Sequence, residues 1–151
     1  EAIHTHLLDN LLDIWVDPLR QLDPHGDPLE EILTYVRRKL AMSRDMPRES
    51  RLFANEVIQG APNTEAFLKG ELKDLVDEKA KVIRAWQKAG KLRKVDPYHL
   101  IFSIWAITQH YADFEAQVRV LIPDESAGWD AAHAHVETLF RKLLTSPETA
   151  D

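Results

Sequence analysis

Hydrophobic residues recur along this chain at steps of three and four positions, the spacing that places side chains on one face of an α-helix. No segment shows the clean alternation of apolar and polar residues that is typical of a half-buried strand. The pattern predicts helices over about residues 1–19, 27–43, 47–59, 64–89 and 126–145, and a further helix that starts at about residue 97 and contains residues 104–114. We therefore expect an all-α fold, with the 151 residues in one domain.

Local start and stop signals support these boundaries. Asp27 and Asp96 each precede a proline, which suits the first position of a helix, and Asp27 is placed to cap the second helix. Glu30 is spaced to complete a capping box with Asp27. The helix over 64–89 is expected to break near Gly70, and Gly90 suits the residue that follows its last turn.

Composition agrees with a soluble globular domain, since 44% of the residues are hydrophobic and 29% are charged. The absence of cysteine excludes disulfides, cysteine-based zinc sites and a thiol nucleophile, and it fits a reducing cytoplasm. No apolar run approaches the roughly 20 residues of a membrane span. The net charge is −6, and the sequence has no cluster of lysine and arginine large enough to bind along the phosphate backbone of a nucleic acid. This segment alone is therefore not expected to bind DNA.

The segment IWAITQHYADF (104–114) reads as the middle of a helix, yet it carries four consecutive hydrogen-bonding side chains, from Thr108 to Tyr111. Each of them needs a partner when it is buried, or it costs free energy. Helical geometry separates them, because Thr108 and Gln109 fall beside Trp105 whereas Tyr111 falls on the opposite side. Both sides are largely apolar, so we expect this helix to be covered twice.

The side that carries Tyr111 is predicted to meet a second copy of the chain. A bundle this small seldom covers one helix on both faces, and the last predicted helix offers a long apolar stripe as a companion. Two helices from each of two chains would form an intermolecular four-helix bundle. The residues predicted at this homodimer interface are Leu100, Ile104, Ile107, Tyr111, Phe114, Trp129, His133, Val136 and Phe140.

The side that carries Trp105 suggests a pocket for a small planar ligand. The Trp105 ring offers a stacking surface, and one turn later the Gln109 amide offers both a donor and an acceptor. Paired hydrogen bonds from such an amide read adjacent C=O and N–H groups, as they do on base edges. Trp15 and Phe53 are candidates for further aromatic residues that line this pocket, and Glu56 is a candidate acceptor for a ligand N–H.

Two other interpretations of these residues stay open. Tryptophan and phenylalanine on helical stripes are often plain core residues, Gln109 can bond a neighbouring carbonyl, and Glu56 can pair with Arg51. The chain would then be a helical dimerisation scaffold without a ligand.

An enzyme is the other class to consider, because the chain holds seven histidines and many carboxylates. His133 and His135 point to different sides of a helix and cannot share a metal there. His110 and Asp113 lie about one turn apart, but a pair is two ligands short of a structural site. No HExxH motif, nucleophile elbow or phosphate loop is present. We predict no enzymatic activity, no metal and no cofactor.

Four segments carry a resemblance to a known family: LLDIWVDPL (11–19), SRLFANEVIQGAP (50–62), LKDLVDEKAKVIRAWQKAGKL (72–92) and DPYHLIFSIWAITQHYADF (96–114). They resemble the C-terminal half of RutR-type regulators, which belong to the TetR family of bacterial repressors. The resemblance implies a repressor of pyrimidine-utilisation genes, in which uracil or thymine binds the helical C-terminal domain and releases operator DNA. It also implies dimerisation through the last two long helices.

Carried over residue by residue, the resemblance implies that Trp15, Trp105 and Gln109 touch the pyrimidine. Phe53, Glu56 and Thr108 are its second-tier candidates.

The chain also departs from the family pattern. The family's N-terminal helix-turn-helix is not in this sequence, so residues 1–151 are expected to be the C-terminal ligand-binding and dimerisation domain, and DNA is expected to be bound only through that missing domain. Segment 122–130 does not match the family closely, which leaves open a TetR-type regulator with a different effector.

Overall fold

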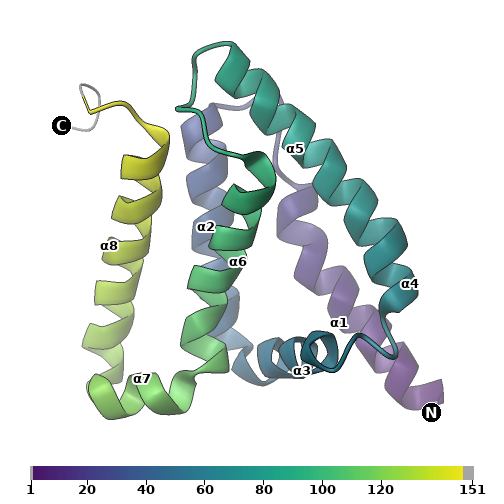
Figure 1. Cartoon of the computed structure of the whole chain (residues 1–151). Coiled ribbons are helices and arrows are strands. Elements are labelled where there is room, and N and C mark those ends of the chain that lie inside the picture. The colour runs from purple at the N-terminus through teal and green to yellow at the C-terminus, as the bar shows by residue number, and fades with distance from the viewer. Residues whose placement is uncertain (1, 148–151) are drawn as a thin grey trace.

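The computed structural model describes the backbone of residues 2–147 and the side chains of residues 8–147, and all regular secondary structure in that part is helical (Figure 1). The predicted all-α fold is confirmed. No helix in the described part has the length and apolar character needed to cross a membrane. The elements are α1 (Ala2–Arg20), α2 (Pro28–Asp45), α3 (Pro47–Ile58), α4 (Glu65–Phe67), the π-helical turn η1 (Leu68–Leu72), α5 (Lys73–Lys88), α6 (Pro97–Asp113), α7 (Glu115–Leu121) and α8 (Glu125–Leu144).

Aspartate side chains cap the first turns of α2, α6 and α8. Asp27, Asp96 and Asp124 each accept a hydrogen bond from the backbone N–H three residues later, at 3.0, 3.1 and 3.2 Å. The capping box expected for α2 is only half formed, because the Glu30 carboxylate pairs with Arg37 at 2.7 Å instead of returning to the cap.

The helices end where the backbone conformation changes. Gly90 has a φ of +76°, and the N–H of Lys91 reaches back to the carbonyl of Trp86 at 2.9 Å, which closes the end of α5. The predicted break at Gly70 is observed as the π-helical turn η1. One break was not predicted: Phe114, at φ −115°, ends α6 and starts the separate short helix α7.

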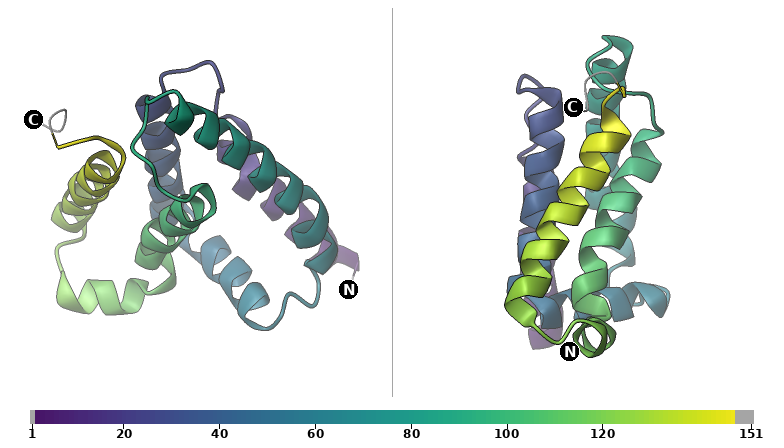
Figure 2. Two further views of the ribbon diagram at one scale, coloured as in Figure 1. Left: turned by 45° about the horizontal axis from the view of Figure 1, so that its top comes forward. Right: turned by 90° about the vertical axis from the view of Figure 1, so that its left-hand side faces the viewer.

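Helix α2 lies at the centre of the domain. It packs against α6 and α8 on one side of the molecule and against α1 on the other, while α3 crosses the end of the bundle (Figures 1 and 2). Its buried residues are Pro28, Ile32, Leu33, Tyr35, Val36, Lys39, Leu40 and Ser43. The core is thus built around the buried face of one helix.

Polar contacts fix the surrounding elements to this centre. Arg37 of α2 forms an ion pair with Glu137 of α8. The buried ammonium of Lys79, on α5, donates to the carbonyl of Leu22 at 2.9 Å. This bond fixes the loop that precedes α2 to α5. These contacts connect segments that are far apart in the sequence.

Both sides of α6 are partly covered by helices of the same chain, chiefly α2, α3 and α5. Four residues expected at a dimer interface, Leu100, Ile104, Val136 and Phe140, are buried in the single-chain core, where α6 and α8 pack on α2. Their side chains have almost no area left for a partner. Ile107, Tyr111, Trp129 and His133 are half-buried, and Phe114 is exposed.

Candidate effector pocket

Four of the six predicted ligand-binding residues line one cavity, with a volume of about 40 Å³. Trp15 comes from α1, Phe53 from α3, and Trp105 and Gln109 from α6. Segments separated by many residues in the sequence therefore meet at the place that the α6 pattern indicated. The remaining lining residues are Val16, Leu19, Tyr35, Lys39 and Leu72.

Four of the nine residues that line the cavity are aromatic. The Trp15 and Phe53 ring centroids lie 6.5 Å apart, with 38° between the ring planes. The indole N–H of Trp105 donates to the hydroxyl oxygen of Tyr35 at 2.8 Å. Because that N–H is used, Trp105 offers a ligand its ring face and no hydrogen bond.

Gln109 retains its full hydrogen-bonding capacity. Its side-chain amide forms no hydrogen bond or ion pair with any other described residue, although it lines the cavity and is half-buried. The alternative in which Gln109 bonds a neighbouring carbonyl is therefore not observed. An amide in this state is ready to form two hydrogen bonds with a ligand.

Lys39 is the most unusual residue in the cavity. Its side chain is only 2% exposed, and Nζ lies 4.2 Å from the centroid of the Trp15 ring, a cation–π contact. Within the described part of the chain, the ammonium has no hydrogen-bond acceptor and no ion-pair partner. Burial lowers the pKa of Lys39 to about 7, and the charge of Asp113 opposes that shift.

The two other predicted residues have local structural contacts. The Glu56 carboxylate accepts hydrogen bonds from the Asn63 backbone, the Asn63 side chain and the Thr64 hydroxyl, which closes the loop after α3. The Thr108 hydroxyl donates to the carbonyl of Ile104 at 2.6 Å. Neither residue lines the cavity. Arg51, the alternative partner of Glu56, pairs with Glu115 instead.

Tyr35 and Lys39 were missed by the sequence analysis. They lie one helical turn apart on the buried face of α2, among the apolar positions of that helix. A lysine on an otherwise apolar stripe was the available signal, because a buried ammonium is costly unless something compensates it.

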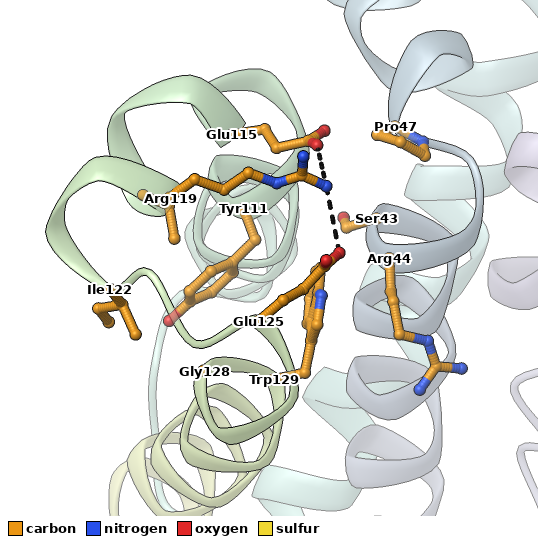
Figure 3. A pocket seen from close by; sticks show the side chains of 11 residues that line it. Ser43, Arg44, Pro47, Tyr111, Glu115, Arg119, Ile122, Glu125, Gly128 and Trp129 are labelled. Atoms are coloured by element: carbon orange, nitrogen blue, oxygen red, sulfur yellow. Dashed lines mark hydrogen bonds and ion pairs between the residues drawn. The ribbon is translucent and has the colours of Figure 1, made fainter.

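A second cavity, of about 70 Å³, lies between α2, the end of α6, α7 and α8 (Figure 3). Tyr111 and Trp129 line it with ring centroids 5.9 Å apart, and Arg119 pairs with Glu115 at 2.7 Å and Glu125 at 3.1 Å. None of the predicted ligand-binding residues lies there.

No metal site emerges, since the described residues contain no cluster of three or more histidines and carboxylates able to hold an ion. His110 is exposed and stacks on Phe114, with centroids 5.1 Å apart. Asp113 accepts a hydrogen bond from the Ser50 hydroxyl at 2.7 Å. The two residues considered as a pair thus have separate contacts.

Comparison with known proteins places this helical architecture in a family. Residues 8–146 match the family described as YcdC-like protein, C-terminal region. The chain belongs to this family. Proteins named HTH-type transcriptional regulator RutR, from Escherichia coli K12, Escherichia coli O157:H7 and Shigella flexneri, are each 50% identical to it over 121 residues. The matched segment covers 80% of this YcdC-like domain and 57% of each relative, so the chain spans little more than half their length. The resemblance to RutR-type regulators is confirmed.

The buried lysine of this YcdC-like domain predicts a pH-dependent stability. Below pH 7, Lys39 is charged in the folded and the unfolded chain, and the folded state carries the full cost of burial. Between pH 7 and the ordinary lysine pKa of 10.5, only the unfolded chain keeps that proton, so the free energy of unfolding rises with pH. From pH 7 to 9, the parent should gain about 2 kcal/mol relative to the Lys39→Met variant.

Urea unfolding at several pH values measures this difference. The exposed lysine of the same domain at Lys81 supplies the control, since Lys81→Met should follow the parent. Identical pH profiles for the parent and Lys39→Met would contradict the prediction.

Proposed function

We propose that this chain is the effector-binding and dimerisation domain of a TetR-type transcriptional repressor, and that a planar pyrimidine, uracil or thymine, binds the cavity between α1, α3 and α6. The observation that carries the proposal is the convergence of Trp15, Phe53 and Trp105 around an unpaired Gln109 amide. The names of the RutR relatives support the regulatory part. The ligand stacks on the indole rings while Gln109 pairs with its C=O and N–H groups.

Ligand entry requires movement of the cavity wall. A volume of about 40 Å³ holds about three water molecules, whereas a pyrimidine with two carbonyl groups has eight non-hydrogen atoms. The wall that must yield includes Trp15 on α1, the first helix of the domain. A ligand that favours the wider arrangement shifts the population toward it by its differential affinity for the two states. In this proposal α1 carries the shift to an N-terminal DNA-binding domain.

The dimer is proposed to form through the exposed faces of α6 and α8. On α6, exposed Phe102 and Ala106 lie on the side opposite Tyr111, so the proposed surface differs from the one expected from the sequence. Helix α6 has no Asp, Glu, Lys or Arg from Pro97 to Ala112, including its exposed positions. Phe102 and Phe114 are 47% and 56% exposed. On α8, Leu139 and Leu143 are exposed in the same way. The uncharged, partly aromatic surface of α6 is typical of the core of a protein interface.

Ligand binding is tested by calorimetry with uracil, and with adenine as a purine control. Trp105→Ala and Gln109→Leu should each weaken uracil binding at least tenfold, about 1.4 kcal/mol, because one removes the stacking surface and the other the paired hydrogen bonds. Gln117→Leu, an exposed glutamine on α7, should bind like the parent. The assignment fails if Gln109→Leu folds normally and keeps the parent affinity.

The dimer surface is tested by sedimentation. Ala106 lies exposed on the uncharged face of α6, so Ala106→Glu would bury an unpaired carboxylate in the interface and should weaken dimerisation at least tenfold. Ala85→Glu places the same charge at an exposed alanine of α5 and should leave the dimer intact. An unchanged dimer in Ala106→Glu would move the interface elsewhere.

Repressor release is tested with the full-length protein. Uracil should lower its affinity for operator DNA, measured by fluorescence anisotropy with a labelled operator, because the ligand binds one of two domain states more tightly. Gln109→Leu should bind the operator like the parent and lose the response to uracil. An operator affinity that is the same with and without uracil would rule out this mechanism.

A further inference from the structure

The edge of the cavity that α2 forms differs chemically from the edge that α6 forms. Tyr35 and Lys39 are one turn apart on α2, and both line the cavity. The Tyr35 oxygen already accepts the Trp105 indole N–H, while its own O–H is donated to no described residue. Burial raises the pKa of Tyr35, which keeps the phenol protonated at neutral pH. Lys39 adds an ammonium, which has N–H donors and no acceptor.

No group in the cavity lining satisfies these donors. The lining contains no aspartate or glutamate, and within the described residues the Lys39 ammonium forms no hydrogen bond or ion pair. It lies over the ring of Trp15, and the charge of Asp113 acts on it from outside the lining. The cation–π contact holds the ammonium beside the ring without using its N–H groups as hydrogen-bond donors. A ligand at this edge therefore meets donors that lack acceptors.

We propose that Lys39 determines the class of ligand that the cavity takes: a planar oxo-heterocycle, with a ring carbonyl oxygen facing the α2 edge, in preference to a ring that carries an amino group there. This inference rests on the proposed function and deepens it. A carbonyl oxygen accepts from both Lys39 and Tyr35, whereas an amino group places N–H donors against N–H donors and leaves them unpaired.

Gln109 cannot supply this discrimination. Its amide has both a donor and an acceptor, and rotation of the side chain by half a turn exchanges them, so it can pair with either a carbonyl or an amino group. The ammonium form of Lys39, which predominates below pH 7, has no such alternative. Sites built to hydrogen-bond a specific ligand group reject analogues that cannot make the bond much more strongly than apolar sites reject a change in shape. Discrimination between a carbonyl and an amino group is therefore assigned to Lys39 on α2. Gln109 on α6 is assigned hydrogen bonding to either group.

The test compares uracil with cytosine, which replaces one carbonyl by an amino group on the same ring. Calorimetry on the full chain at pH 6.5 should give at least about 30-fold tighter binding of uracil by the parent. Lys39→Met should weaken uracil binding at least about tenfold and change cytosine binding less than about threefold, so the preference collapses. Gln109→Leu should weaken both ligands and keep the preference.

Lys79→Met supplies a matched control, because Lys79 is also a buried lysine but donates to Leu22 outside the cavity. It should retain the parent's ratio of uracil to cytosine affinity. Circular dichroism checks that each variant is folded. A parent that binds neither pyrimidine contradicts the proposed function itself. A parent that prefers uracil, with the same preference in Lys39→Met, overturns the role of Lys39 alone, and so does a parent that binds cytosine as tightly as uracil.

Discussion

The burial of α2 among four other helices is the constraint on which the rest of this domain depends. The face that α2 buries must be largely apolar, and any polar side chain on that face costs free energy unless it finds a partner. Three polar residues nevertheless lie on its buried face at steps of four: Tyr35, Lys39 and Ser43. Tyr35 and Lys39 line the cavity at Trp105, and the unpartnered Ser43 hydroxyl lines the cavity beneath α7 (Figure 3). The polar stripe of α2 thus coincides with the space left open in the bundle.

The buried Lys39 ammonium lowers the stability of the domain and leaves hydrogen-bond donors available to a ligand. An apolar side chain at Lys39 would remove the cost of a buried ammonium, and the chain offers no carboxylate in the cavity to compensate it. The Trp15 ring, through its face, and the charge of Asp113 supply part of the compensation. A ligand oxygen would supply the rest, so binding would relieve a cost already present in the empty domain. Because the Trp15 ring belongs to α1, the same contact joins the cavity to the first helix.

Local signals in the sequence made most of the helices predictable. They did not show which element packs against each helix face. The caps at Asp27 and Asp96 and the end at Gly90 depend on a few neighbouring residues, which the sequence displays directly. Periodicity shows that a face is apolar but does not show which element covers it. Leu100 was therefore assigned to a partner, although it is buried in the core of the same chain, where α6 packs against α2, α3 and α5. Likewise, the partners of Glu56 lie in a loop whose path the sequence pattern does not reveal.

The polar run in α6 shows how one helix serves several neighbours. Thr108 is satisfied within its own helix, Gln109 faces the cavity, His110 is exposed against Phe114, and Tyr111 packs on Trp129 of α8. Cavity residue and exposed residue are therefore adjacent in the sequence, on a helix without a formal charge over this stretch. A small rotation of α6 about its axis, as a ligand wedges against Trp105, would turn the exposed face by the same angle. In the proposed dimer, pocket and interface could then not change independently, because a rigid helix forms part of both.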